Sequence, residues 1–188
     1  MISVLLLAAT VAIPNNFLLY EKAAAKKDDN PETSWSASSK KAARLVVNPC
    51  QKAALGQKGR TQARTLVYTA VPDYAKSEQV ILYSSAAAAG KVLRDVEAAV
   101  RSCGTKGYRY SANVTAGLGD RALSVTGQAY QDGKPAVGGD RGIVTRRGNA
   151  LILYMVSGEW GKPATSDFKQ QTKDTKTMLA KICTIADC

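Results

Sequence analysis

The stretch 141-RGIVTRRGNALILYMVSG-158 decides the fold that this sequence predicts. Residues 143–146 are expected to form one strand, residues 147–149 a turn, and residues 150–157 a second strand. The turn contains glycine and asparagine, which tolerate the positive φ that tight hairpin turns require. The second strand, ALILYMV, is apolar at successive positions. We therefore expect it in the middle of a sheet, with both of its faces covered.

Further strands surround this hairpin. Apolar and β-branched residues predict strands at residues 60–71, 78–84, 108–114 and 122–130. Pro72-Asp73 is expected to turn the chain between the first two, and Asp132-Gly133 after the last is a strong hairpin signal. The central hairpin therefore has enough partners for a sheet of five to seven strands.

Two helices are expected beside the sheet. Residues 86–103 follow a capping residue, Ser85, and precede Gly104, which is expected to end the helix in the αL conformation. One apolar stripe runs along this helix at helical spacing, through Ala89, Leu93, Val96, Val100 and Cys103. A last helix is expected at residues 165–183, with apolar positions Phe168, Thr175, Met178, Leu179 and Ile182.

These elements predict the α+β class, with a mostly antiparallel β-sheet flanked by a long central helix and a C-terminal helix. The 188 residues are expected to form a single domain over positions 1–188. Residues 21–41 are polar and rich in Ala, Ser and Lys, and predict a loop. Its tryptophan, Trp35, is expected either to anchor the loop on the body or to line a ligand cleft.

The N-terminal stretch MISVLLLAATVAIP is interpreted as the start of the folded domain, with Ser3 capping a short helix that ends before Pro14. No Lys or Arg precedes Lys22, whereas a signal peptide has a basic first region. A signal core without its basic end is the alternative. We expect the export signal or anchor to lie outside this chain. No apolar run reaches 18 residues, so no transmembrane segment is expected.

The chain is strongly basic, with a formal net charge of +11, which predicts attraction to anionic surfaces. The most one-sided stretch runs from Thr33 to Pro72 and contains no acidic residue. Its basic residues are Lys40, Lys41, Arg44, Lys52, Lys58, Arg60 and Arg64. They form either an anion-binding face or a solvated surface. No nucleic-acid partner is expected, because the stretch lacks interleaved aromatic residues and a recognised motif.

The absence of histidine argues against an enzyme. It removes the usual general base near neutral pH and the commonest metal ligand, so no catalytic residues, metal or cofactor are expected. Asp120, Asp140 and Glu159 are the carboxylates that an enzyme would use. They are expected in loops, and no two of them have an informative spacing.

Four cysteines, Cys50, Cys103, Cys183 and Cys188, fit two structural disulfides in an oxidising compartment. Three pairings are possible, of which Cys50–Cys103 with Cys183–Cys188 is preferred; four buried thiols in a cytosolic protein are the alternative. Residues 48-NPCQ-51 predict a short helix capped by Asn48. The preferred first bridge would tie this helix to the end of the long one.

Several stretches in this order resemble the PknH-like extracellular sensor domain, a family of actinobacterial secreted proteins, lipoproteins and receptor-kinase ectodomains. They are 4-VLLLAATVAIP-14, 48-NPCQ-51, 80-VILYSSAAAAGKVLRDVEAAVRSC-103, 117-GLGDRALSV-125 and 144-VTRRGNALILY-154. The resemblance implies an extracellular or cell-surface module with an antiparallel sheet, structural disulfides and a cleft for an unidentified ligand. It also implies the Cys50–Cys103 bridge. Cys183 and Cys188 lie later than the second bridge expected of the kinase member.

The sequence therefore predicts a non-catalytic, extracytoplasmic, sensor-like ligand-binding domain. The expected ligand is a small molecule or an anionic envelope component. Candidate binding residues are Arg146 and Arg147 for an anion and Tyr154, Trp160 and Trp35 as apolar walls. An envelope-associated protein-interaction or inhibitor module is the alternative, with a protein partner in place of the small ligand.

Overall fold

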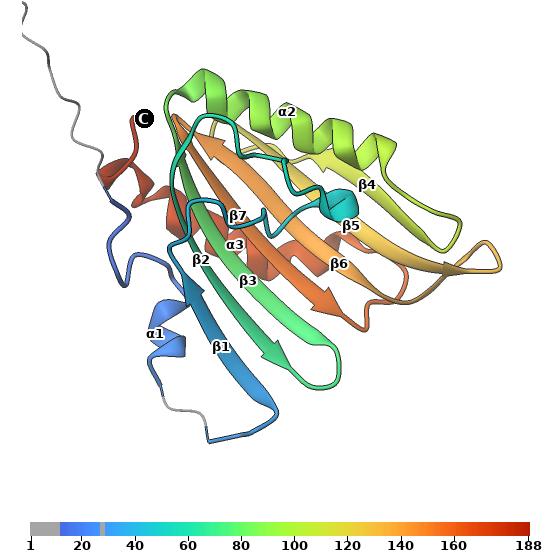
Figure 1. The fold of residues 1–188 in the computed structure, drawn as a ribbon. Coiled ribbons are helices and arrows are strands. Elements are labelled where there is room, and N and C mark those ends of the chain that lie inside the picture. Colours follow the sequence, from blue (N-terminus) through green and yellow to red (C-terminus); the bar gives the residue numbers. More distant parts are fainter. Residues whose placement is uncertain (1–11, 27–28) are drawn as a thin grey trace, which may run out of the picture.

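The computed structural model describes residues 12–26 and 29–188 and contains one seven-stranded antiparallel sheet (Figure 1). Its strands are β1 (Thr33–Ser38), β2 (Arg60–Ala70), β3 (Tyr74–Tyr83), β4 (Tyr108–Val114), β5 (Arg121–Gln131), β6 (Lys134–Arg147) and β7 (Ala150–Gly158). The order across the sheet is β1-β2-β3-β7-β6-β5-β4. This arrangement confirms the predicted α+β class. The helix expected near residues 4–11 lies outside the described residues.

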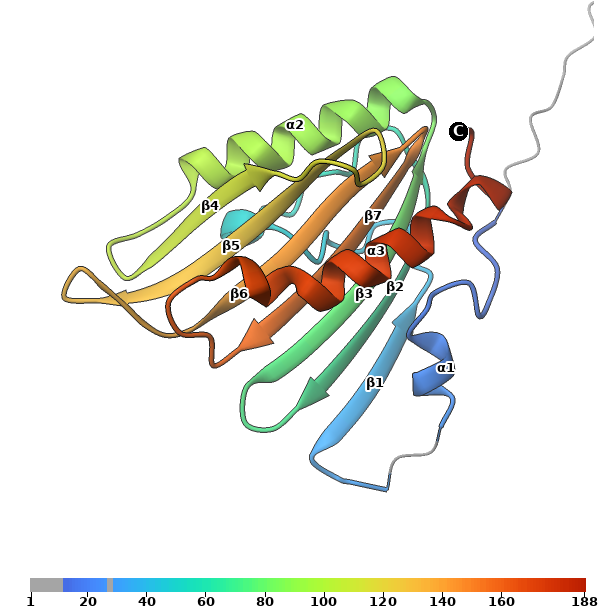
Figure 2. The ribbon, with the colours of Figure 1, turned by 180° about the vertical axis from the view of Figure 1, so that it is seen from behind.

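Strand β7 is the middle strand, and both of its faces are buried, as its sequence predicts. Leu151 and Leu153 pack into a core beneath α2 (Ala86–Ser102). Ile152 and Tyr154 point the other way, into a second core that includes Met178 of α3 (Lys169–Leu179). Figures 1 and 2 show the two helices on opposite faces of the sheet.

Helix α2 forms as the apolar stripe predicts. The Ser85 side chain accepts a hydrogen bond of 3.1 Å from the Ala88 N–H, and every residue of the predicted stripe is buried. The helix ends at Ser102. Gly104 has a φ of +155°, so the prediction that it ends the helix in the αL conformation is wrong.

The prediction of a loop over residues 21–41 is wrong, because this segment contains α1 (Glu21–Ala24) and the edge strand β1. Among the described residues, strand β1 pairs with β2 alone, and four of its six residues are polar. One of them, Ser34, lies 2.8 Å from Thr69 Oγ1. An edge strand of this composition needs no apolar alternation, since most of its side chains face solvent. Polarity alone therefore could not separate it from a loop.

Three smaller differences concern the ends of elements. Residues 49–51 form the predicted short helix, η1 (Pro49–Gln51), but Asn48 does not cap it and instead donates to the Lys52 carbonyl at 3.1 Å. Strand β6 begins nine residues before the predicted strand, at Lys134 rather than at residue 143. The predicted C-terminal helix is divided into η2 (Thr165–Phe168), α3 and η3 (Ile182–Thr184).

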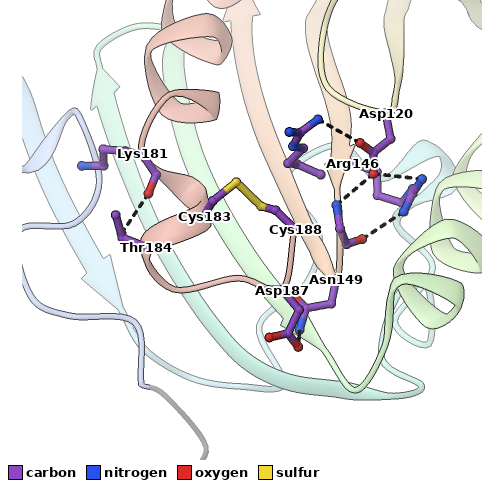
Figure 3. Close-up of a disulfide and its surroundings, with 10 residues drawn as sticks. Asp120, Arg146, Asn149, Lys181, Cys183, Thr184, Asp187 and Cys188 are labelled. Atoms are coloured by element: carbon purple, nitrogen blue, oxygen red, sulfur yellow. Dashed lines mark hydrogen bonds and ion pairs between the residues drawn. A yellow bond between two sulfur atoms is a disulfide. The ribbon is translucent and has the colours of Figure 1, made fainter.

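Both preferred disulfides form. Cys50–Cys103 ties η1 to the end of α2, and Cys183–Cys188 closes a short loop at the end of the chain. This C-terminal loop docks on the β6–β7 hairpin turn (Figure 3). The amide of Asn149 donates to the Asp187 carboxylate at 3.0 Å, and the Asp187 N–H donates back to Asn149 Oδ1 at 3.0 Å.

The turn residue Gly148 is required on two grounds. Its φ is +54°, and a Cβ at this position would lie 1.8 Å from the Asp187 carbonyl oxygen. The hairpin signal in the sequence thus marks a turn that the C-terminal loop covers closely.

We predict that the two disulfides contribute unequally to stability. In the chain-entropy model, C50S/C103S should lower the free energy of unfolding by about 4 kcal/mol and C183S/C188S by about 2 kcal/mol, because the bridged segments differ in length. Urea unfolding of both double variants measures the difference. Equal losses would show that loop closure is not the main source of the stabilisation.

Candidate functional site

A cavity on the α2 face lies between the segment 44–51 and the sheet, and has a volume of about 300 Å³. One wall is this segment, which crosses the front of the sheet in Figure 1. The opposite wall consists of side chains from β4, β5, β6 and β7. Its principal residues are Arg44, Asn48 and Gln51 from the segment, and Tyr110, Val125, Asp140, Met155 and Ser157 from the sheet.

The segment is fixed to the sheet by the buried side chain of Gln79. Its amide oxygen accepts from the Val46 N–H at 3.2 Å, and its amide nitrogen donates to the Arg44 carbonyl at 2.9 Å and to Thr65 Oγ1 at 2.7 Å. The fully buried Val47 packs over Gly142 so closely that a Cβ at residue 142 would lie 2.8 Å from it. Because Gln79, Val47 and the Cys50–Cys103 bridge all hold it, this cavity wall is preorganised.

Asp140 is the charged group on the sheet side of the cavity. It accepts a hydrogen bond of 2.7 Å from the hydroxyl of Tyr108, and no cation pairs with its carboxylate within the described residues. Burial, and then the hydrogen bond to Asp140, raises the pKa of Tyr108. Burial and the nearby Asp140 charge also raise the pKa of Tyr110. Both hydroxyls therefore remain protonated near neutral pH and can donate hydrogen bonds.

Asn48 contributes a second polar group without a complementary partner. Its Oδ1 is buried and accepts no hydrogen bond from any residue that the structure describes. A buried acceptor of this kind costs free energy unless a ligand or water donates to it. Arg44, also on this wall, supplies a positive charge. The cavity thus offers two acceptors, a tyrosine hydroxyl and a cation between the apolar surfaces of Val125 and Met155.

The five residues predicted to bind a ligand do not lie together. Arg146 and Arg147 flank the β6–β7 turn, and Asp120 bridges them at 3.0 Å and 3.3 Å. Their side chains leave opposite faces of the strand, since they are consecutive residues of β6. Arg146 alone therefore faces α2.

Tyr154 lies in the core on the α3 face, with no exposed surface. Its hydroxyl donates to Glu78 at 2.6 Å, and Glu78 also accepts from the Leu19 and Tyr20 N–H groups at 2.9 Å and 2.8 Å. Burial raises the pKa of Glu78 against the opposing effect of these hydrogen bonds. The structure therefore gives Tyr154 a packing role in attaching residues 19–20 to the sheet.

Trp35 lies on β1 and anchors the edge of the sheet. Its ring packs against Tyr68 at a centroid distance of 4.7 Å. The ammonium of Lys76 lies 5.2 Å from the ring centroids of Trp35, Tyr68 and Tyr20, an arrangement that favours a cation. Because Lys76 already occupies this aromatic cluster, the position fits the predicted anchor.

Trp160 lies after the end of β7, at the opposite end of that strand from the Arg146 turn. Its indole N–H donates to the Val156 carbonyl at 3.3 Å, and the guanidinium of Arg141 lies 5.0 Å from its ring centroid. Arg141 is fully buried, pairs with Asp167 at 2.9 Å and bonds to the Gly127 carbonyl at 2.9 Å. Trp160 thus covers an internal arginine that joins β6 to the connection before α3.

The basic stretch divides into surface and interior residues. Arg60 is buried and donates to the carbonyl groups of Gly56, Lys41 and Ala43. Arg64 is buried in an ion pair with Glu21. Burial by itself would raise the pKa of Glu21, but the hydrogen bonds from Arg64 and the Leu18 N–H outweigh it and lower that pKa. Two of the seven cations thus stabilise the fold instead of facing a partner.

Sequence reasoning missed most of the cavity. Asp140 was considered only as a loop carboxylate, and that placement is wrong because it lies within β6. Tyr108, Tyr110 and Asn48 were not selected. The available signal is the alternation of Tyr108 and Tyr110 in the strand expected at residues 108–114, but the sequence could not show that segment 44–51 would cover that face.

Comparison with known proteins shows the fold. No protein-family model matches the chain, and no curated protein sequence matches it significantly. The crystal structure of the extracellular domain of PknH from Mycobacterium tuberculosis aligns with a TM-score of 0.57 over 90% of this chain and 94% of that domain. The two share a fold. Their sequence identity is 11%, so the similarity does not extend to activity.

A second solved structure aligns weakly. LpqN from Mycobacterium tuberculosis, described as involved in cell envelope biogenesis, covers 80% of this chain and 82% of its own at 11% identity, with a TM-score of 0.28. A similarity at that score does not support a shared fold. The PknH comparison thus confirms the expected architecture, while the expected membership of its family stays a prediction.

Replacing Tyr154 should affect stability more at high pH than at low pH. The folded protein binds the Glu78 proton more tightly than the unfolded chain, so the stability that this proton contributes is lost as pH rises through the raised pKa. Y154F removes a hydrogen bond that favours the carboxylate. It should cost about 1.5–3 kcal/mol at high pH and less in acid.

Urea unfolding of Y154F at about pH 5 and about pH 9 measures this difference. Y130F is the matched control, because the Tyr130 ring lies under Arg109 on the surface and its hydroxyl makes no hydrogen bond within the described residues. An equal loss at both pH values would contradict the assigned role of Glu78.

Proposed function

We propose that this chain is a non-catalytic, extracytoplasmic ligand-binding domain whose ligand occupies the cavity between residues 44–51 and the sheet. The observation that carries the proposal is the set of uncompensated polar groups there. Asp140 has no cationic partner and Asn48 Oδ1 has no donor among the described residues. Polar groups without partners lower the stability of a folded protein, but in a binding site a ligand can form the missing hydrogen bonds.

The same groups define the chemistry of the ligand. Asp140 and Asn48 accept hydrogen bonds, which suits hydroxyl or amino groups on a small polar molecule. The Tyr110 hydroxyl adds a donor, and Val125 and Met155 give an apolar surface for a ring. Amino sugars and small wall-derived glycopeptides combine these features. Arg44 would favour members of this class that also carry a carboxylate.

An extracellular or surface location is supported by two independent features. Four cysteines form two disulfides, which persist in oxidising compartments. The structurally similar PknH domain is itself described as extracellular. Within the described residues, no helix is long and apolar enough to cross a membrane.

The absence of catalysis is proposed from the chemistry of the side chains. The sequence contains no histidine. Asp140 lies in the middle of β6, whereas Asp120 contacts Arg146 and Gly148 at the end of that strand, so the two do not form a carboxylate pair at one site. The protonated tyrosines of the cavity are hydrogen-bond donors rather than nucleophiles at neutral pH.

Ligand titrations followed by amide NMR test the binding site. Glucosamine, N-acetylglucosamine and soluble muropeptides are the probes. We expect saturable shifts at residues 44–51 and Tyr110 with at least one probe, and about tenfold weaker affinity for D140N, which keeps the Tyr108 hydrogen bond and removes the charge.

D132N is the matched control, because Asp132 is an exposed carboxylate in the β5–β6 turn at a φ of +49°, which asparagine tolerates. Its affinity should equal that of the unmodified protein. The proposal is wrong if no probe gives saturable shifts in this cavity, or if D140N binds as tightly as D132N.

The location can be tested by trapping thiols in the native host. Whole cells are quenched in acid and the protein is denatured with an alkylating reagent. Without reductant we expect no labelled cysteine, and after reduction four, because both bridges form in the compartment where the protein resides. Four labels without reduction would place the protein in the cytosol.

A further inference from the structure

A second pocket lies on the other flank of the α2 face, between the first half of α2 and the ends of β5 and β6. Its volume is about 450 Å³. Three arginines from three elements line it: Arg94 of α2, Arg121 of β5 and Arg146 of β6. Leu93 and the small residues of the first turns of α2 form its apolar floor. None of these residues lines the cavity of the proposed function.

The positive charge around this pocket is only partly neutralised. Asp120 is shared by Arg146 and Arg147, and Figure 3 shows Asp120 beside Arg146 at the hairpin turn. Glu97 is likewise shared by Arg121 at 2.7 Å and by Arg101 at 3.1 Å. Each carboxylate thus faces two guanidinium groups, so one positive charge remains at each pair.

Arg94 adds a further positive charge. Its side chain forms no ion pair or hydrogen bond with the described residues, whereas Lys91 on the same helix pairs with Asp95 at 2.7 Å. A Cβ placed on Gly90 would lie 3.6 Å from Arg94 Nη1 and 3.9 Å from Arg146 Nε. Two guanidinium groups therefore approach the same point beside α2, and the one carboxylate in the lining of the pocket, Asp120, already pairs with Arg146. Like charges repel at such separations unless an anion lies between them.

Two of the three guanidinium groups, those of Arg146 and Arg121, are also held in place. Arg146 donates to the Gly148 carbonyl at 3.0 Å as well as to Asp120, and Asp120 itself accepts from the Gly148 N–H at 2.9 Å. Arg121 is oriented by Glu97. A Cβ at Gly90 would be in ordinary van der Waals contact with Arg146, so a longer side chain there would enter the pocket. Fixed guanidinium groups bind an oxyanion with less loss of side-chain entropy than mobile lysines.

We infer that this arginine pocket binds a phosphate-type oxyanion. Arginine suits this ligand because its planar donors match two oxygens of a phosphate at once. The phosphate can belong to a soluble phosphate compound or to an anionic lipid headgroup, since both present the same group. The inference does not depend on the proposed function, because the two sites share no residue.

Pyrophosphate titration at physiological salt tests the pocket, with binding followed by calorimetry and amide NMR. We expect saturable binding with shifts at Gly90, Asp120 and Arg146. R94Q should weaken binding about tenfold, because it removes one of the three guanidinium groups of the pocket. It should still fold, because the Arg94 side chain makes no contact that the fold requires. R109Q is the control; it removes the same charge from an exposed arginine on β4. It should bind within about twofold of the unmodified protein.

A second variant separates loss of binding from loss of fold. Gly90 lies in the interior of α2, where leucine has a higher helix propensity than glycine, and its φ is not in the left-handed region. G90L should therefore fold at least as stably and yet lose pyrophosphate binding, because the new side chain fills the pocket. D140N should bind pyrophosphate normally. The arginine pocket and the cavity of the proposed function are therefore tested separately, because G90L changes only the first and D140N only the second.

Vesicles distinguish the two sources of phosphate. Binding to phosphatidylglycerol vesicles but not to phosphatidylcholine vesicles, with competition by pyrophosphate, identifies a lipid headgroup. Pyrophosphate binding without vesicle binding identifies a soluble phosphate compound. The inference is overturned if pyrophosphate gives no saturable binding, or if R94Q and G90L bind it as R109Q does.

Discussion

The burial of both faces of β7 is the constraint on which the rest of the structure depends. The α2 core needs Leu151 and Leu153, and the α3 core needs Ile152 and Tyr154. Both cores also contain apolar residues of the neighbouring strands, and β7 is the strand that contributes to both at the middle of the sheet. Its neighbours β3 and β6 provide the backbone hydrogen bonds along its length. A strand buried in this way couples the two layers into one cooperative unit.

Around this apolar centre, buried polar side chains attach the irregular segments. Gln79 and Arg60 hold the segment 41–56 on one face, and Glu78 and the Glu21–Arg64 pair hold residues 18–21 on the other. Arg141 does the same for the connection after β7. Gln79, Arg60 and Glu78 bond to backbone atoms of the segments they hold, whereas Arg64 and Arg141 bond to side chains. These interactions specify where loops lie more than they add net stability.

Most of the architecture could be predicted from the sequence, because the spacing of apolar residues and the residues that favour turns are local signals. Six of the seven strands were expected, and the α2 stripe and both disulfide pairings were correct. Strand β1 was not predicted, because an edge strand rich in serine has no apolar face. The first part of β6 was not predicted, because Gly138, Gly139 and Gly142 interrupt the alternation of apolar and polar residues. Gly142 leaves room for the side chain of Val47.

The candidate sites were much less accessible to sequence reasoning, for a physical reason. Asp140, Tyr110 and Asn48 come from three distant segments, and only the path of residues 41–56 across the sheet brings them together. Arg146 was selected as an anion-binding residue, but its partners Arg94 and Arg121 were not, because the pairing depends on how α2 lies over β6. Tyr154 and Trp160 were selected for their size and proved to pack against internal charged groups.

The Cys50–Cys103 bridge has a consequence beyond the folded chain's stability. It joins the outer wall of the cavity to α2, while the opposite wall belongs to the sheet. Reduction would leave that wall attached to the sheet through Gln79, Val47 and Arg60 without its covalent tether to the helix. The shape of the binding cavity is thereby linked to the thiol–disulfide balance of its surroundings. For the proposed ligand, we therefore expect full affinity only where the surroundings are oxidising.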